Sequence, residues 1–269
     1  AVGGVINFIT TDSYANSIST TFGSNNTKGL TLKLHRNINN HSISLVADGT
    51  SSDGISVAPT GTEDDGYDAN NMTLNTHSKY DGYDIRTTLI RRSSDSDLDG
   101  GSGDDLDYTA ENNMNLYQLS SKIDNSKGFS NFTFSRTEYD RDYHNGTEHD
   151  EYDSTSNTYL LTNTVLNDKW DITPGIEYEY FDGSFRNRGS YTASVDTDGE
   201  NVGYFLNGNL IASDKLLLSA GVRQDDPSAF GDYTTYRLGG TYELTGSLKL
   251  KSNYATSVKT PTLYEMHGS

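Results

Sequence analysis

The sequence predicts an all-β fold, an antiparallel transmembrane β-barrel, from three observations. Hydrophobic residues make up only 32% of the chain and its mean hydropathy is −0.69, so a large soluble core would be poorly supplied with apolar side chains. Apolar and polar residues alternate with period two in many runs, and short turns alternate with long polar loops. A membrane barrel tolerates this composition because each strand needs only one apolar face, toward lipid.

The strands are identified by the alternation. Between Leu30 and His35 the three leucines fall on one face of an extended chain, and the Thr, Lys and His fall on the other. Many such runs span about 8 to 12 residues, the length of tilted barrel strands. We therefore expect about thirteen strands, at residues 17–23, 29–36, 41–48, 71–80, 83–92, 114–124, 128–138, 157–166, 169–181, 201–211, 215–223, 233–243 and 247–257.

The connections alternate in length. Tight turns rich in Asn, Asp and Gly, which accept positive φ or bond their own backbone, are expected at residues 37–40, 81–82, 124–127, 167–168, 213–214 and 244–246. Long polar loops are expected at roughly 49–70, 93–113, 139–156, 182–200 and 224–232. Short turns at one rim and long loops at the other are typical of barrels in bacterial outer membranes.

Tyrosine is abundant, with 19 residues, and many lie in or beside the expected strands. An aromatic ring with a polar tip suits the headgroup level of a membrane, so these tyrosines predict an aromatic girdle. Tyrosine also suits any exposed sheet, which is the alternative. The tyrosines in question are Tyr80, Tyr83, Tyr117, Tyr139, Tyr159, Tyr178, Tyr180, Tyr204, Tyr236, Tyr242 and Tyr254.

Charge and cysteine content exclude several functions. The formal charge of −18 argues against a nucleic-acid surface, which needs clustered Lys and Arg, and favours cationic ligands. The chain has no cysteine, so disulfides, thiolate metal sites and cysteine nucleophiles are impossible. No G-x-S-x-G, H-E-x-x-H or phosphate-binding glycine loop occurs, so we expect a protein that is not an enzyme.

Three acidic stretches lie in the expected loops. The first two, at residues 52–67 and 95–107, combine Asp with Gly, and hard divalent cations such as calcium take six to eight oxygen ligands from loops of this kind. A solvated acidic loop without a fixed ion is the alternative. The third stretch holds His144 and His149, whose spacing matches no recognised ligand pattern, so we interpret it as a mobile outer loop.

Both ends of the chain resemble known sequence motifs. AVGGVINFITT at residues 1–11 resembles the end of the plug domain of TonB-dependent outer-membrane receptors, which leads into the first barrel strand. SVKTPTLYEMHGS at 257–269 resembles a barrel segment of that family that commonly reads F-K-A-P-[TN]-L-x-[EQ]-L-[YH]-G, with Val258 and Thr260 departing from it. AGVRQDD at 220–226 resembles the G-x-R-x-D strand before it. The layout is most similar to the cobalamin receptors.

This resemblance implies a domain division, a location and a set of partners. Residues 1–12 would be the C-terminal end of a plug, and 13–269 the N-terminal part of a barrel with about 13 of the family's 22 strands. The protein would lie in the bacterial outer membrane, among its lipids, and take up cobalamin with energy supplied by TonB, which would bind a region before Ala1. A ferric siderophore is the alternative ligand, and a secreted soluble protein that binds calcium or glycans is the alternative class.

The resemblance also implies metal ligands, because early loops of the cobalamin receptors gather aspartates around calcium. The positions that match best are Asp53, Glu63 and Asp65, although Glu63 stands where that pattern has Asp. In the second loop the alignment can slide by a residue or two, so Asp97 or Asp99 and Asp105 or Asp107 are the candidates.

Overall fold

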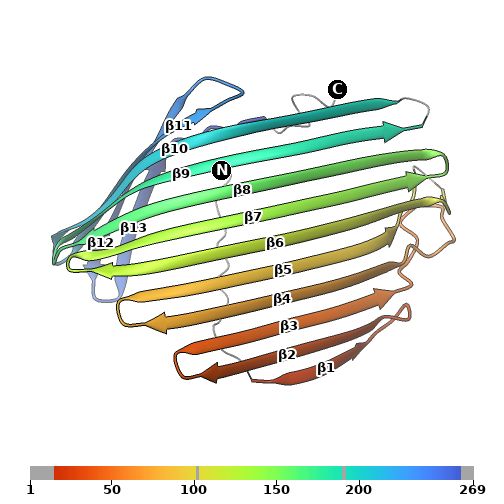
Figure 1. The fold of residues 1–269 in the computed structure, drawn as a ribbon, viewed down its shortest axis with the longest axis horizontal. Coiled ribbons are helices and arrows are strands. Elements are labelled where there is room, and N and C mark those ends of the chain that lie inside the picture. Colours follow the sequence, from red (N-terminus) through yellow and green to blue (C-terminus); the bar gives the residue numbers. More distant parts are fainter. Residues whose placement is uncertain (1–14, 101–102, 190–191, 262–269) are drawn as a thin grey trace.

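The fold is a single curved sheet of thirteen antiparallel strands (Figure 1). The structure is a computed structural model, and it describes residues 15–100, 103–189 and 192–261. The strands are β1 (Ser17–Phe22), β2 (Lys28–Ile38), β3 (His41–Ser52), β4 (Tyr67–Tyr80), β5 (Tyr83–Asp97), β6 (Tyr108–Asn125), β7 (Gly128–Asn145), β8 (Glu148–Leu166), β9 (Trp170–Arg188), β10 (Ala193–Ser213), β11 (Leu216–Pro227), β12 (Tyr233–Thr245) and β13 (Leu248–Ala255).

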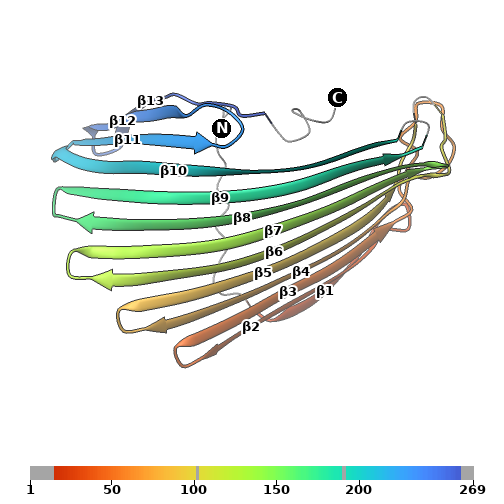
Figure 2. The same ribbon diagram turned by 45° about the horizontal axis from the view of Figure 1, so that its top comes forward.

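Each strand pairs with the next one along the chain, so the order in the sheet runs from β1 to β13 without a crossover. The strands β1 and β13 form the two edges. Figure 2 shows the sheet curling into a trough, with β11 to β13 folded over toward its far side. The predicted all-β antiparallel barrel wall is confirmed, and each of the thirteen expected strands corresponds to one observed strand.

Tight turns close one rim of the trough. The β2–β3 turn uses Asn39 at φ 51° and the β4–β5 turn uses Gly82 at φ 79°, both in the left-handed region that Asn and Gly tolerate. The other turns of this rim join β6 to β7, β8 to β9, β10 to β11 and β12 to β13, at the positions that the sequence indicated.

The prediction of long loops at 139–156 and 182–200 is wrong. Strands β7 and β8 continue through the first of these stretches to a two-residue turn at Gly146–Thr147, and β9 and β10 occupy most of the second. At the ends of these strands the outer face carries polar and charged residues, so the row of apolar outer residues that revealed the other strands is missing. At 19 residues, β8 and β9 are each roughly 60 Å long, whereas a membrane crossing needs only about 9–11 residues.

The other three predicted loops are present but shorter than expected. The connections run over residues 53–66, 98–107 and 228–232. The first two lie side by side at the loop rim. Backbone N–H groups of the 53–66 loop donate to carboxylates of the 98–107 loop: Ala58 N–H to Asp99 Oδ2 at 2.7 Å, and Thr62 N–H to Asp104 Oδ1 at 2.7 Å.

The two faces of the sheet differ in polarity. Residues paired across strands share a face, and the register aligns Phe132 with Leu161 and Leu161 with Ile176. Leu161 is 50% exposed, and leucines, isoleucines and phenylalanines continue around this outer face on the other strands. Such an exposed apolar band is what a lipid-facing surface requires.

Aromatic residues border this band on the outer face. Tyr159 and Tyr178 lie 6.2 Å apart between ring centroids toward the loop rim, as do Tyr236 and Tyr254 at 6.1 Å, and Tyr80 stacks on Tyr83 at the turn rim. These positions fit the predicted girdle. Tyr139 is an exception, because it pairs with Met114 and Ser154 on the opposite, hollow face.

The hollow face is polar and carries hydrogen bonds between neighbouring strands. Asn71 donates to Asp48 at 2.9 Å, and Arg223 forms an ion pair with Glu177 at 2.7 Å and another with Asp225. Among the described residues the only buried apolar side chains are those of Ala58, Ala110 and Pro227. The described part of the chain therefore forms a sheet with an apolar face toward lipid and a polar face toward water, and it has no globular core.

The predicted plug end at residues 1–12 and most of the terminal motif, from residue 262 onward, lie outside the described residues, so the domain division stays a prediction. Across 15–100, 103–189 and 192–261, no helix has the length and apolar character to cross a membrane.

Candidate ligand groove and acidic loop site

Three carboxylates converge where the 53–66 and 98–107 loops meet. Oxygens of Glu63, Asp65 and Asp99 all lie within 4.8 Å of one another, a spacing at which one cation can contact all three. Asp65 is buried, with 8% of its surface exposed, whereas Glu63 and Asp99 are half-buried. The three residues form the acidic loop site.

Local turns hold Asp65 in this position. Val57 N–H donates to Asp65 Oδ2 at 2.6 Å, which closes the 53–66 loop on itself. Gly54, at φ 74°, lies against the Asp65 carbonyl so closely that a Cβ would come within 1.7 Å of it. Glycine is therefore required here both for the backbone angle and for the close approach.

The electrostatics of the acidic loop site favour a cation. Desolvation and the charges of Asp104, Asp99, Asp65 and Asp97 raise the pKa of Glu63. For Asp65, the Val57 N–H acts to lower the pKa, but burial and the neighbouring Asp99 and Asp97 carboxylates outweigh it and raise the pKa. Like charges held this close disfavour full ionisation until a cation compensates them.

Two oxygens of the site also lack partners. Glu63 Oε2 and Asp65 Oδ1 are buried and accept no hydrogen bond from the part of the chain that the structure describes. A buried acceptor without a donor is costly, and a bound cation would satisfy both atoms. The residues present therefore fit an oxygen-ligated ion such as calcium.

Asp104 has a different role at the same rim. Its carboxylate accepts hydrogen bonds from the Thr62 backbone at 2.7 Å and the Thr62 hydroxyl at 2.9 Å. The Thr62 hydroxyl contributes most to lowering the pKa of Asp104, and the Thr62 and Glu63 backbones add to it against the effect of desolvation. Asp104 therefore joins the two loops as an ionised residue.

The remaining predicted ligands are placed differently. Asp53 and Asp97 line a neighbouring acidic groove with Asp64, Asp68, Asp95 and Glu111. The carboxylate of Asp105 accepts from Asn145 at 2.9 Å, its backbone N–H donates to Asp99, and Asp107 lies exposed in the turn before β6. Of the seven predicted residues, the structure brings together Glu63, Asp65 and Asp99.

A groove of about 720 Å³ lies on the hollow face near the loop rim. Three aromatic rings from β7, β8 and β9 lie in a row along it: the ring centroids of Tyr143 and Tyr152 are 6.1 Å apart, and those of Tyr152 and Phe185 are 4.7 Å apart. Tyr139, Met114 and Val195 extend the apolar lining. We call this the aromatic groove.

Polar groups border the aromatic groove. Arg141 donates to Asn112 at 2.6 Å and lies over the Tyr143 ring at 6.0 Å, and Arg92 also lines the groove. Asn71, Asn112, Ser94, Ser154 and Thr197 offer amide and hydroxyl groups at its walls. Such a surface suits a large ligand with flat apolar faces and many hydrogen-bonding groups.

No sequence motif predicted this groove. Its residues come from seven strands, β4 to β10. The alternation indicates which of them share a face only when the strands are known to extend beyond the membrane. The alternate positions of Tyr139, Arg141 and Tyr143 are the signal that was available, because they form a large-residue run on one face of β7.

Comparisons with known proteins agree with this architecture. The family model described as "TonB dependent receptor-like, beta-barrel" matches residues 6–269. Over 113 residues the chain is 26% identical to the vitamin B12 transporter BtuB of Vibrio cholerae serotype O1, an alignment that covers 41% of the chain and 17% of that protein.

Solved structures show the same fold. The copper transporter OprC superposes with a TM-score of 0.77 at 12% identity, covering 92% of this chain and 45% of that one. The ferric yersiniabactin uptake receptor FyuA of Yersinia pestis gives 0.70 at 16% identity, covering 88% and 45%. The siderophore receptor PiuA of Acinetobacter baumannii gives 0.69 at 12%, covering 88% and 48%.

The chain thus spans less than half the length of each of these structures. The family match nevertheless covers nearly all of it, and the lipid-facing band and tight-turn rim agree with a wall in the bacterial outer membrane. The chain belongs to the TonB-dependent receptors and forms part of their β-barrel.

Proposed function

We propose that this chain forms the ligand-binding wall of an outer-membrane receptor that takes up cobalamin with energy supplied by TonB. The observation that carries the proposal is the aromatic groove, which is on the hollow face and near the loop rim, where a ligand arriving from outside the cell would enter. Resemblance to the vitamin B12 transporter supports this choice of ligand.

The chemistry of the aromatic groove supports a corrinoid. A corrin macrocycle has broad apolar faces and a periphery of amide arms. Tyr152 and Phe185 offer ring faces for the former, while Asn71 and Asn112 offer amide groups for the latter. Uptake of so large a molecule against a gradient needs an energy source, and TonB is the partner that the family implies.

Calcium would bind at the acidic loop site and order the loops beside the groove. Glu63, Asp65 and Asp99 would hold the ion, because their oxygens converge and two of them lack hydrogen-bond donors. Ion binding would remove the repulsion between these carboxylates and fix the 53–66 loop against the 98–107 loop. The chain would then meet its ligand with a preorganised rim.

A ferric siderophore is the second candidate. Arg92 and Arg141 give the aromatic groove two positive charges in a strongly acidic chain, and an anionic ferric chelate would be attracted to them. A secreted soluble module is set aside, because the family match and the exposed apolar band both indicate a membrane barrel.

Binding of labelled cyanocobalamin to the purified receptor in detergent, with and without calcium, tests the proposal. We expect saturable binding that calcium strengthens and that Tyr152→Ala weakens. If the receptor does not bind cobalamin but binds a ferric siderophore saturably, the ligand of the aromatic groove is the siderophore. Binding that is equal with calcium and with chelator would remove the role given to the acidic loop site.

A further inference from the structure

Of the described residues that line the aromatic groove, only Arg92 and Arg141 are basic. Arg92 pairs across the sheet with Met114 of β6, and Arg141 pairs with Asn112 of the same strand. Because alternate residues of a strand share a face, both arginines lie on the hollow side of the sheet, on β5 and β7. These two strands flank β6 and are about 10 Å apart, so both long side chains reach the space over β6.

Contacts within the groove fix the direction of the Arg141 side chain. Its Nε donates to Asn112 Oδ1 at 2.6 Å, and its guanidinium carbon lies 6.0 Å from the centroid of the Tyr143 ring. The terminal nitrogens of Arg141 have no acceptor among the described residues. A guanidinium held by one edge and one face is preorganised to bind a phosphate or carboxylate with its remaining N–H groups.

The two arginines of the groove also lack counterions. Within the described part of the chain, no carboxylate forms an ion pair with Arg92 or Arg141. Asp48 lies in the same row of the sheet as Arg92, yet it accepts a hydrogen bond at 2.9 Å from Asn71, which lies between them. The overall charge of −18 favours cationic ligands, but two unpaired guanidinium groups give the groove the opposite charge. An anion between them would relieve their mutual repulsion.

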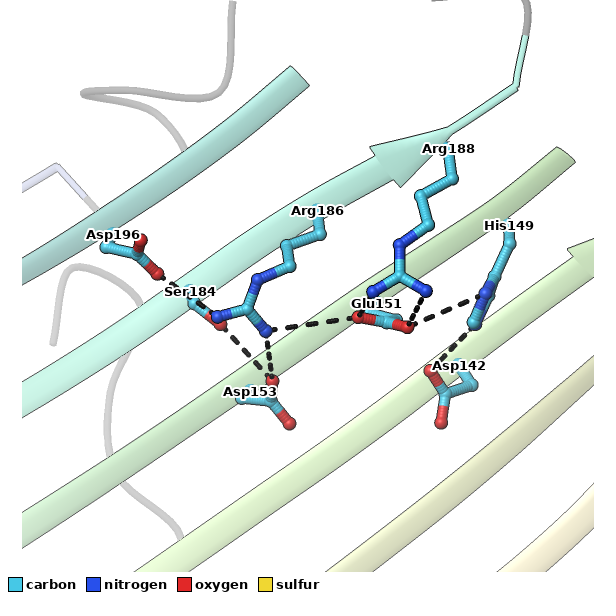
Figure 3. Close-up of polar contacts among 8 residues, drawn as sticks. All are labelled: Asp142, His149, Glu151, Asp153, Ser184, Arg186, Arg188 and Asp196. Carbon is cyan, nitrogen blue, oxygen red and sulfur yellow. Dashed lines mark hydrogen bonds and ion pairs between the residues drawn. The ribbon is translucent and has the colours of Figure 1, made fainter. Parts of the chain in front are cut away.

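The acidic residues beside the groove, Asp140 and Asp153, have their side chains on the other face of the sheet. Asp153 directly follows Tyr152, so the alternation places its carboxylate on the outer face, where it pairs with Asp140 and with Ser184. There it forms an ion pair with Arg186 at 3.6 Å and accepts a hydrogen bond from Ser184 at 3.2 Å (Figure 3). Neither acidic residue therefore competes with a ligand for the arginines of the groove.

We propose that Arg92 and Arg141 bind an anionic oxygen group of the ligand, a phosphate ester or a carboxylate, while the flat part of the ligand lies on Tyr152 and Phe185. This arginine subsite rests on the function proposed above, because the aromatic groove is taken as the ligand site. In cobalamin the anionic group is the phosphodiester that joins the corrin ring to its nucleotide base. The arginines then favour complete corrinoids over those that lack this group.

Equilibrium binding of two corrinoids to the purified receptor in detergent, with calcium present, tests the arginine subsite. Cyanocobalamin carries the phosphodiester, and dicyanocobinamide lacks it together with the nucleotide base. The double substitution Arg92→Gln and Arg141→Gln should weaken cyanocobalamin binding about tenfold or more, because charged hydrogen bonds are lost. Its affinity for dicyanocobinamide should equal that of the wild type, which also shows that the variant is folded.

The matched control is Arg91→Gln. Arg91 is adjacent to Arg92 on β5, but it pairs with Met72 on the outer face, so its substitution should leave the affinity for both corrinoids unchanged. If the double variant binds cyanocobalamin as tightly as the wild type does, or loses affinity for both corrinoids equally, the arginine subsite is wrong while the proposed function stands.

A second ligand separates the arginine subsite from the choice of cobalamin. If the wild type binds no cobalamin, the function proposed above fails, and the same variants are titrated with ferric enterobactin, an anionic tris-catecholate chelate. A loss of about tenfold or more in the double variant alone would then uphold the arginine subsite for an anionic ligand of another class. Equal binding by wild type and double variant, or no binding of any of these ligands by the wild type, would overturn it.

Discussion

Asp65 is the residue on which the acidic loop site depends most. It is buried, it accepts from Val57, and one of its oxygens is free for an ion. Asp65→Asn removes one of three converging charges, so we expect calcium affinity to fall at least about tenfold. Isothermal titration of the purified receptor measures this. Asp107→Asn is the control, because Asp107 is exposed and outside the site; an equal loss in both variants would contradict the assignment.

The raised pKa values of Glu63 and Asp65 predict how the acidic loop site responds to pH. Because both values are raised, the ordered loops bind these protons more tightly than open loops do. Protonation therefore stabilises the metal-free loops fully below the ordinary values of 4.5 and 3.8, and this stabilisation is lost as pH rises through the raised values.

Calcium competes with protons for the same carboxylate oxygens, so the affinity for calcium falls as the pH is lowered. We expect the decline to begin above pH 4.5, the ordinary value for Glu63. Titrations across the range from about pH 7.5 to about pH 5 measure it. Asp65→Asn should flatten the profile. A calcium affinity that stays constant down to the ordinary carboxyl range would show that these two residues are not ligands.

Tyr152 is central to the aromatic groove, since its ring contacts Tyr143 on one side and Phe185 on the other. Tyr152→Ala removes a half-buried aromatic anchor of the kind that dominates binding energy, so we expect ligand affinity to fall about tenfold or more. Equilibrium binding of cyanocobalamin measures the effect. The control is Tyr204→Leu, on the lipid-facing side of β10 where Tyr204 pairs with Ile176, and this variant should bind as the wild type does.

At this scale the sequence supplied residue types but not their arrangement. It placed Glu63 and Asp65 in one acidic loop, yet could not choose between Asp97 and Asp99, because a glycine-rich loop permits either register. The structure assigns Asp99 to the site through its bond from Ala58, a contact 41 residues away in sequence. Contacts of that separation depend on how the two loops pack.

At the scale of elements, strands were predicted where their two faces differ in polarity. Leu30 to His35 alternates and was recognised, whereas residues 148–156 and 182–188 have only polar residues on their outer face and were assigned to loops. Their pairing is nevertheless continuous, from Glu148 opposite Asn145 to Leu160 opposite Thr133. Backbone hydrogen bonding extends these strands without the periodicity that lipid imposes.

Hydrogen exchange tests this extension. Backbone amides at 148–156 bond to β7 and β9, so we expect them to exchange much more slowly than those of the 53–66 loop. Mass spectrometry of the receptor in micelles resolves both segments. The 53–66 loop serves as the internal control in calcium-free buffer. Equal exchange in the two segments would restore the loop assignment.

For the whole molecule, the alternation predicted a wall with a lipid side and a hollow side, and the register confirms it. The aromatic groove could not be predicted in the same way, because it depends on seven strands, their stagger and the curvature of the sheet. Curvature arises from strand twist and register over the complete sheet, neither of which a local pattern contains.

The two-sided wall leads to a prediction with adjacent residues on β8. Leu161 is on the outer face and half exposed to lipid, while Leu160 is on the hollow face, directly opposite Glu177 of β9. An arginine at 161 would place a charge in hydrocarbon, so Leu161→Arg should lower the free energy of unfolding by about 2 kcal/mol. Leu160→Arg should cost much less, because water and the Glu177 carboxylate are within reach of its guanidinium.

Denaturant unfolding of the receptor in phospholipid vesicles measures both variants, with Leu161→Ala as the matched control for lost side-chain volume. The difference should persist at high salt for Leu161→Arg, since desolvation in lipid is not screened by ions. If the two arginine variants are equally stable, the faces assigned to β8 are not separated by solvent. The band of exposed apolar side chains would then need an occupant other than lipid.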